Sequence, residues 1–339
     1  NLKIVIIDEA HFIKNRTKKR TKAVQALCKN IPNILALTGT PIVNRPVEMF
    51  NAINLVSPSI FPNFFRFASR YCNATRSRFG WDFNGSSNTE ELHEKLTSTI
   101  MLRRLKQDVL KDLPAKVRSI ILMELTNRKE YQSAESDFIG FLKSIDSAKA
   151  TAAENAEQLV KIEGLKQLSL KGKTEAIMDW IDNFLESEEK LILFCTHTSA
   201  IEMLMKKYNS IAVKIDGSVS MENRQKAVDE FQNNSEIKLF IGNIKAAVVG
   251  ITLTASSNVA FLELGWTPGE MQQAEDRCHR IGQSESVNIY CLIAENTIEE
   301  KIANLLDKKQ RVLDAVLDGK DSDEESLISE LINKYREGK

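Results

Sequence analysis

The chain has 339 residues, no net charge, 42% hydrophobic and 27% charged residues, which is ordinary for a folded globular protein. No apolar run is long enough to span a bilayer and the first residues lack a secretory-signal pattern, so neither a membrane protein nor a secreted one is expected. Five scattered cysteines without a CxxC pair favour an intracellular location, the nucleus in a eukaryote or the cytoplasm and nucleoid in a prokaryote or phage.

The charge is unevenly distributed along the chain. Residues 1–115 hold 18 Lys and Arg against 9 Asp and Glu, and the remainder is acidic. A basic first third can attract phosphate backbones, and the run Lys14–Lys22 is a candidate contact surface. Charge scattered over solvated faces explains the same composition equally well.

The hydrophobic pattern predicts an α/β fold. The expected strands are 2–7, 34–37, 117–125, 190–195, 211–215, 238–241, 259–264 and 287–291. The expected helices are 21–28, 126–170, 174–185, 221–231, 269–280 and 298–317. Alternation in the second half predicts a parallel sheet with helices on both faces, and the whole pattern predicts two α/β lobes separated by a helical section.

Two adjacent carboxylates, Asp8 and Glu9, directly follow the first strand. Ligands of open α/β sheets bind beyond the carboxyl ends of strands. There, one carboxylate can hold Mg²⁺ through water and the other can deprotonate an attacking water, as nucleotide hydrolysis requires. The alternative is that the Asp-Glu pair only caps a helix, which is a common arrangement.

Thr38, Gly39, Thr40 and Pro41 follow the next expected strand. Gly39 permits tight backbone geometry, and the two hydroxyls can donate hydrogen bonds in the same crevice. An ordinary turn is the alternative.

The segment 273–283 carries Arg277 and Arg280, which are three residues apart and should project from one face of a helix. Two guanidinium groups suit the charge of a transferring phosphoryl group. A surface salt-bridge network is the alternative.

Gly172, Lys173 and Thr174 resemble the end of a phosphate-binding loop. The pattern GxxxxGK[ST] requires glycine where Gln167 stands, and the preceding residues are expected to be helical. Lys173 is therefore interpreted as a helix-start residue.

The motifs in order resemble the Swi/Snf family of superfamily II helicase-like ATPases over roughly residues 1–315. The motifs that carry the resemblance are Ile7–His11, Leu37–Pro41, Met101–Lys106, Asp112–Pro114, Leu191–Phe194, Asp216–Ser218 with Arg224, Phe231–Gln232, Gly250–Thr254, Trp266–Pro268 and Gln273–Gln283. The form of the last motif and the short helical insert are similar to the branch that contains annealing helicases.

The resemblance implies ATP and Mg²⁺ as cofactors, double-stranded DNA as partner, and two RecA-like lobes. It implies Asp8 as the Mg²⁺ ligand, Glu9 as general base, and Arg277 and Arg280 as arginine fingers. Further residues implied at the nucleotide or in coupling are His11, Thr38, Gly39, Thr40, Gly250 and Gln273. Residues implied along the DNA are Thr196, Asn243, Thr252 and Trp266, to which the basic run adds Lys14.

The sequence departs from the family pattern at its fifth motif, where Val248 and Val249 precede Gly250 and Thr252 replaces the usual Asn. No phosphate-binding loop is found, so the resemblance implies that the chain is a fragment whose first lobe is incomplete at its N-terminus. The expected domains are 1–125, a partial first lobe with a protrusion at about 45–113; 126–170, a helical insertion; 171–317, the second lobe; and 318–339, an acidic stretch with a last helix.

The expected function is an ATP-dependent translocase on double-stranded DNA. A strand-separating helicase, or a fragment that binds DNA without ATPase activity of its own, remains the alternative.

Overall fold

The computed structural model describes residues 2–42, 45–77, 80–104, 106–144, 152–247 and 250–318, together with Leu331 and Tyr335. The chain divides into two compact units. Unit 1 comprises Asn1–Arg104, Thr267–Gly269 and Leu305–Glu330, and unit 2 comprises Leu105–Trp266, Glu270–Asn304 and Leu331–Lys339. Both units combine helices with parallel strands, so the α/β prediction is confirmed. Within the described ranges, no helix has the length and apolar character that crossing a bilayer requires.

The first strands of unit 1, β1 (Ile4–Ile7) and β2 (Asn33–Ala36), form a parallel pair in which Ile4 lies opposite Asn33. The 3-10 helix η1 (Ala10–Ile13) and α1 (Lys19–Cys28) connect them. The hydrophobic run 2–7 would suit a strand buried on both faces, but one face of β1 is open, because Ile4 and Ile6 are 54% and 58% exposed. A β-branched run predicts a strand, but it does not state which of its two faces other elements cover.

The rest of unit 1 is a helical subdomain around an aromatic core that includes Phe50, Phe67 and Leu92. Its helices are η2 (Pro46–Met49), α2 (Phe50–Val56), α3 (Phe64–Tyr71) and α4 (Thr89–Thr99). Two short strands, β3 (Thr75–Ser77) and β4 (Gly80–Asp82), pair antiparallel in a region where the sequence predicted no strand.

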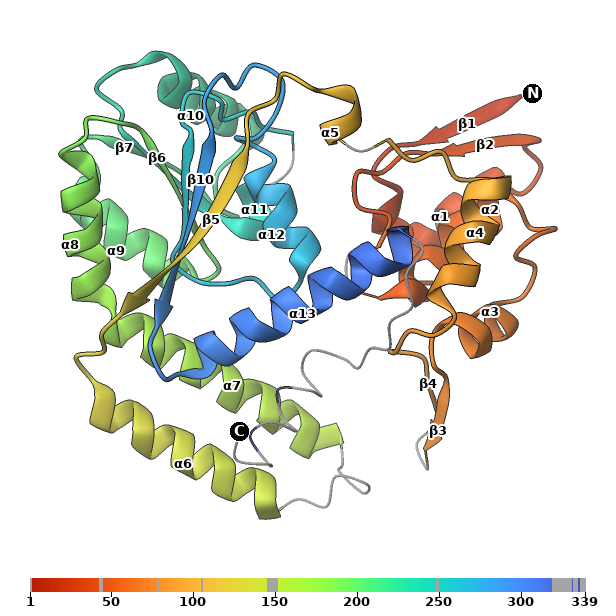
Figure 1. Ribbon diagram of the computed structural model, residues 1–339, viewed down its shortest axis with the longest axis horizontal. Helices are drawn as coiled ribbons and strands as arrows, with labels where there is room; N and C mark the ends of the chain where they lie inside the picture. Colours follow the sequence, from red (N-terminus) through yellow and green to blue (C-terminus); the bar gives the residue numbers. More distant parts are fainter. Residues whose placement is uncertain are drawn as a thin grey trace. The chain divides into compact units, whose positions relative to one another are not determined.

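Unit 2 contains a parallel six-stranded sheet in the order β5-β10-β9-β6-β8-β7 (Figure 1). Its strands are β5 (Lys116–Met123), β6 (Leu191–Cys195), β7 (Ala212–Ile215), β8 (Leu239–Asn243), β9 (Asn258–Phe261) and β10 (Val287–Ala294). Its helices are α5 (Lys106–Val109), α6 (Arg128–Ser144), α7 (Ala152–Gly172), α8 (Thr174–Leu185), α9 (Thr198–Tyr208), α10 (Met221–Asn233), α11 (Ile244–Ala247) and α12 (Pro268–Glu275), and α13 (Ile298–Asp318) begins in this unit.

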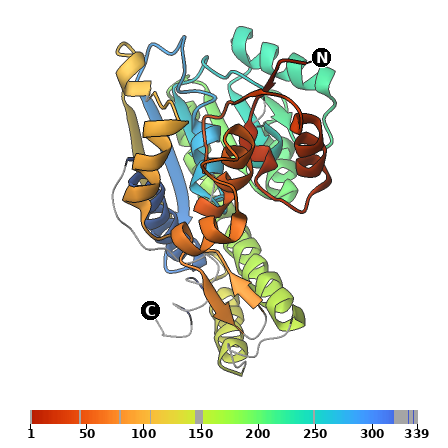
Figure 2. The same ribbon diagram turned by 90° about the vertical axis from the view of Figure 1, so that its right-hand side faces the viewer.

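Strands β6, β8 and β9 are buried on both faces, as the alternating pattern predicted, whereas the edge strand β5 exposes Ile120 and Leu122. On one face α8 and α9 pack against β6, β8 and β9 through residues such as Ile181, Leu204 and Leu193. On the other, Phe231 of α10 lies 5.6 Å from Phe240, and the rings of Phe194 and Phe261 stack at 5.5 Å between centroids. Helices α6 and α7 pack against each other as a pair (Figures 1 and 2).

Three expected elements differ from the structure. Strand β5 hydrogen-bonds to β10 in unit 2, whereas the expected boundary at residue 125 placed it in the first lobe. Sequence pattern reveals a strand but not its partner, so this assignment could not be derived. Helix α12 ends at Glu275 rather than at Arg280. The helix expected over 126–170 is two helices, and most of the stretch expected at 318–339 lies outside the described residues.

Candidate functional site

The acidic pair lies at the carboxyl end of β1, as predicted. Asp8 is exposed, and its Oδ1 accepts the Glu9 backbone N–H at 2.8 Å. Glu9 adopts the left-handed conformation, with φ 48° and ψ 50°. This conformation costs a residue with a Cβ roughly 1–2 kcal/mol and is concentrated at functional sites. The sequence could not reveal this strain, because glutamate carries no left-handed preference.

His11 connects this end of β1 to the end of β2. Its Nδ1 lies 3.2 Å from Glu9 Oε2 and 3.1 Å from Thr38 Oγ1. Burial lowers the pKa of His11 more than the charge of Glu9 raises it, so the imidazole is neutral at pH 7. The backbone supports the same geometry, because the Ala10 N–H donates to the Leu37 carbonyl at 2.9 Å. The predicted proximity of the two motifs is therefore present.

Thr38 and Thr40 lie together, whereas Gly39 has no special conformation. The Thr40 backbone N–H donates to Thr38 Oγ1 at 3.1 Å. A Cβ at Gly39 would meet no atom within 4 Å, and Gly39 is not among the glycines with positive φ. The expectation that Gly39 permits tight backbone geometry was therefore wrong for this conformation.

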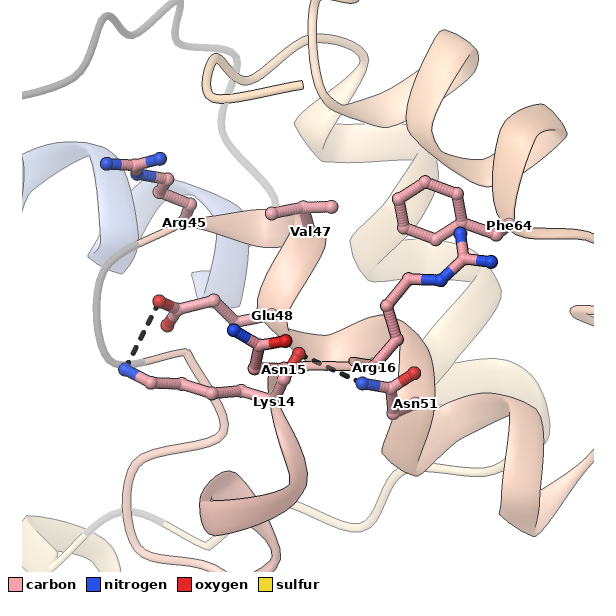
Figure 3. A pocket seen from close by; sticks show the side chains of 8 residues that line it. All are labelled: Lys14, Asn15, Arg16, Arg45, Val47, Glu48, Asn51 and Phe64. Carbon is pink, nitrogen blue, oxygen red and sulfur yellow. Dashed lines mark hydrogen bonds and ion pairs between the residues drawn. The ribbon is translucent and has the colours of Figure 1, made fainter. Parts of the chain in front are cut away.

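Lys14 lines a pocket of about 240 Å³ in unit 1 (Figure 3). The remaining lining residues are Asn15, Arg16, Arg45, Val47, Glu48, Asn51 and Phe64. Lys14 Nζ lies 3.2 Å from Glu48 Oε1, and the Arg16 guanidinium lies 4.3 Å from the centroid of Phe64. Three cationic side chains and one carboxylate thus surround the pocket, although the charge of Lys14 is shared with Glu48.

Arg277 and Arg280 lie beyond the end of α12, which corrects the prediction that they project from one helical face. A shared acceptor holds them instead: Nη1 of each donates to the Ile251 carbonyl, at 3.4 Å from Arg277 and 3.2 Å from Arg280. Arg280 Nη1 also donates to Thr252 Oγ1 at 3.0 Å. Gly250 precedes this acceptor with φ +75°, a conformation that glycine adopts readily.

Gln273 and the acidic residues after it fix the base of this arginine segment. The Arg277 Nε–H donates to the Gln273 carbonyl at 3.3 Å. Glu275 is almost fully buried and accepts from Lys116 and Arg118 of β5 at 2.7 Å each. Burial alone would raise the pKa of Glu275, but the hydrogen bonds and charges of these two cations hold it below its usual value. Sequence reasoning missed this anchor, because its partners lie more than 150 residues away.

Thr196 and Asn243 lie at the carboxyl ends of neighbouring strands β6 and β8. The Asn243 Nδ2–H donates to the Thr196 carbonyl at 2.8 Å. The Thr196 and His197 backbone N–H groups donate to Glu263 Oε2 at 3.1 and 3.0 Å. The end of this sheet is therefore fixed by a buried carboxylate that the sequence did not single out.

His197 bridges that carboxylate and a second one. Its Nδ1 contacts Glu263 Oε1, and its Nε2 lies 3.2 Å from Glu163 Oε2 of α7. Hydrogen bonds to Glu163 and Glu263 raise the pKa of His197 to about 9. Burial would raise the pKa of Glu263, but the hydrogen bonds of His197 lower it to about 2. The imidazole is therefore a cation at pH 7, held between two carboxylates.

Trp266 belongs to the same network and is half-buried. Its indole Nε1–H donates to Glu163 Oε1 at 3.1 Å, and Lys166 Nζ lies 4.5 Å from the ring centroid. Thr196 and Trp266 are thus connected through His197 and Glu163. A single tryptophan and a single threonine in sequence gave no signal of this connection.

Lys173 has a structural role, as predicted. Its side chain is fully buried, and Nζ donates to the Leu262 carbonyl, the Leu292 carbonyl and Glu299 Oε2 at 2.7, 2.6 and 2.6 Å. These acceptors use all three of its protons. A lysine in this position has no donor left for a phosphate.

Comparison with known proteins gives two family matches. Residues 1–179 match the family model of the SNF2-related domain, and residues 172–282 match that of the helicase conserved C-terminal domain.

Individual relatives agree with these matches. The chain is 35% identical over 92% of its length to a Xenopus laevis SWI/SNF-related matrix-associated actin-dependent regulator of chromatin subfamily A-like protein 1, and 37% identical over 94% of its length to the Mus musculus DNA annealing helicase and endonuclease ZRANB3. It spans 32% and 30% of those proteins. The Sulfolobus solfataricus SWI2/SNF2 ATPase core, solved in complex with double-stranded DNA, is 26% identical with a TM-score of 0.50, covering 93% of this chain and 69% of that one.

Proposed function

Because the chain belongs to the SNF2-related family, we propose that it is part of the motor of an ATP-driven translocase on double-stranded DNA. The names of the relatives support this, since they include an annealing helicase and an ATPase core in complex with double-stranded DNA. The chain spans about a third of the curated relatives described above, so substrate and partners are proposed at the level of the motor alone. Residues 1–125, 126–170, 171–317 and 318–339 remain the proposed domains, except that β5 is moved from the first lobe to the second lobe, residues 171–317.

The observation that carries the proposal is the strained acidic turn after β1. Glu9 adopts a left-handed conformation, and its carboxylate contacts His11, which in turn contacts Thr38. We assign Glu9 as the base that accepts a proton from the attacking water, which requires an ionised carboxylate fixed in direction. His11 and Thr38 position it, because the neutral imidazole can share its Nδ1 between the carboxylate and the hydroxyl.

Asp8 suits the Mg²⁺ of an ATP complex. In nucleotide-hydrolysing enzymes Mg²⁺ keeps several waters and uses one or two carboxylates plus phosphate oxygens. Asp8 is exposed, and one of its oxygens is oriented by the Glu9 N–H, which fits that mode of binding. The bound ion would neutralise charge on the phosphates. Thr40, Gly39 and Gln273 are proposed to lie near the nucleotide on the resemblance alone.

Arg277 and Arg280 supply positive charge to the transferring phosphoryl group in this proposal. Both guanidinium groups are oriented by the Ile251 carbonyl, and Arg280 also by Thr252. Arg280 uses only some of its five N–H donors in these bonds, so its other donors can meet phosphate oxygens. Gly250 supports the geometry, because its positive φ precedes the shared acceptor.

Thr196, Asn243, Thr252 and Trp266 are proposed to follow one DNA strand in unit 2. All four make polar contacts that fix their positions, which suits contact with a phosphate backbone. Lys14 is proposed to contribute from the basic pocket of unit 1. These contacts would be sensitive to salt and largely independent of base sequence.

The test is DNA-stimulated ATP hydrolysis by a Glu9→Gln variant. Residues 1–339 contain no GxxxxGK[ST] pattern, so we expect negligible turnover from them alone and place the variant in a polypeptide that also carries a phosphate-binding loop. The amide retains the shape of the carboxylate but cannot accept a proton. We expect kcat to fall by at least about a hundredfold with ATP affinity unchanged.

Glu94→Gln on the exposed face of α4 is the matched control and should hydrolyse ATP at the parental rate. Parental turnover by Glu9→Gln would remove Glu9 as the base. Robust turnover by residues 1–339 alone would show that phosphate is held without the expected loop.

A further inference from the structure

The β3–β4 hairpin is an exposed antiparallel ribbon that extends from α3 and α4 of unit 1 (Figures 1 and 2). A two-stranded ribbon is marginally stable by itself. Here aromatic packing holds its base: Phe83 lies 5.3 Å from Phe64 and 6.0 Å from Phe65, between ring centroids. The hairpin is therefore a fixed part of the helical subdomain, in a region where no strand was predicted.

The hairpin presents large aromatic rings to solvent. Trp81 is 47% exposed and Phe65 is 44% exposed, and the two pack edge to face at 4.9 Å. Trp81 and Phe83 are two residues apart, so they lie on one face of the strand, and their rings are within 5° of parallel. Contiguous exposed aromatic surface is uncommon on proteins and marks interaction sites.

Positive charge accompanies these rings. Residues 64–83 contain four arginines and one acidic residue, Asp82, and one of the arginines, Arg70, is paired with Glu91 outside this range. Arg76 lies directly opposite Trp81 in the hairpin register, so both side chains emerge on the same face. Arg66 follows Phe65 and is also exposed. Aromatic rings interleaved with cations are the chemistry that binds unpaired nucleotides, because every base has a face to stack and every linkage has a phosphate.

We propose that the β3–β4 hairpin binds an unpaired nucleotide at the end of a DNA duplex. Trp81 stacks on the base, and Arg76 contacts an adjacent phosphate. This inference rests on the proposed function, because both take DNA as the ligand of the chain. It adds a second mode of binding, in which the chain distinguishes a junction from continuous duplex. A protein partner would use the same apolar surface but would not require a flat π face.

The experiment compares the affinity of the chain for a blunt duplex and for the same duplex with a short single-stranded tail. A third ligand carries a tail of abasic nucleotides, which retains the phosphates and removes the bases. The variants are Trp81→Phe, which keeps a ring, and Trp81→Leu, which keeps apolar volume without one. Met221→Ala, 82% exposed in unit 2, is the control for loss of an exposed apolar side chain. Melting curves check that each variant folds. We expect them to, because Trp81 is exposed and its replacement removes little buried contact.

We expect Trp81→Leu to weaken binding of the tailed duplex by about 5- to 100-fold, the range for loss of one base stack. Trp81→Phe should remain within about threefold of the parent, because phenylalanine also offers a π face. No variant should change binding of the blunt or abasic-tailed duplex, and the parent should bind the tailed duplex more tightly than either.

Equal binding of the tailed duplex by Trp81→Leu and the parent would overturn the proposal, and so would equal affinity of the parent for base-containing and abasic tails. In both cases the blunt duplex still reports on the translocase: retained duplex binding would leave the proposed function standing. A parent chain that binds none of the three ligands would contradict both proposals.

Discussion

At the scale of single residues, the side chains proposed to act in catalysis are distinguished by a strained backbone or a shared acceptor. Glu9 adopts an unfavourable backbone conformation, and the Ile251 carbonyl accepts from two arginines. A sequence identifies the residue types, since an acidic pair after a strand and two closely spaced arginines are visible in it. A sequence cannot show that Glu9 has a left-handed backbone conformation. Nor can it show that the Ile251 carbonyl is an acceptor for two side chains, because every residue has a carbonyl.

The arginines can be tested individually. Arg280→Ala should lower kcat by about 10³–10⁵ and leave ATP affinity unchanged, because the guanidinium meets charge that develops only in the transition state. Arg280→Lys should not restore turnover, since a point charge cannot donate to Ile251, Thr252 and a phosphate in one plane. Arg277→Ala should be similar or milder. ATPase assays are made on the polypeptide carrying the phosphate-binding loop, with melting curves alongside.

Arg311→Ala is the matched control. Arg311 is exposed on α13 and forms an ion pair with Asp307, one helical turn away. The variant should leave kcat unchanged. A lower melting temperature with full turnover in Arg277→Ala or Arg280→Ala would show that the residue only holds its loop.

At the scale of elements, the sequence predicted the type and order of most strands and helices but not their partners. Helix α8 was predicted with its exact bounds, and the strands of the six-stranded sheet were predicted within a few residues. These elements have long apolar patterns that their burial demands. The partner of β5 was not predicted, because a sequence pattern does not show that a strand pairs with β10 about 170 residues later. The β3–β4 hairpin was missed, because strands this short show little periodicity.

The bridge formed by Glu163, His197 and Glu263 joins α7 to the end of β6, and it should make the stability of the folded chain depend on pH. The pKa of His197 in the folded chain, about 9, is above its unfolded value of 6.5. Its stabilising contribution is therefore fully present below pH 6.5 and is lost as the pH rises through about 9. His197→Gln also leaves Glu263 buried without its cation, which is costly near neutral pH.

We expect His197→Gln to lower the melting temperature by about 4–8 °C at pH 6.5, equivalent to about 2 kcal/mol in a domain of this size. The difference from the parent should shrink substantially by pH 10.5, where the parent has lost the same charge. Groups that titrate elsewhere affect both proteins and cancel in the difference. A melting difference independent of pH across this range would show that His197 contributes packing rather than charge.

At the scale of the molecule, the residues named in the proposed function are distributed over both α/β units. Unit 1 contributes the acidic turn, Lys14 and the basic pocket, and unit 2 contributes the arginines and the network around Thr196. The family matches extend over both units and support a common motor. The ordered series of weak motifs was sufficient to predict that family, because each motif follows an element whose position the fold requires.

The most direct test of this account is displacement of a triplex-forming strand from a long duplex by the polypeptide carrying the phosphate-binding loop. A translocase moving along intact duplex should release the third strand only with hydrolysable ATP, and Glu9→Gln should release none. The two duplex strands should remain paired throughout. ATP hydrolysis without release of the third strand, or release accompanied by separation of the duplex strands, would contradict translocation on double-stranded DNA.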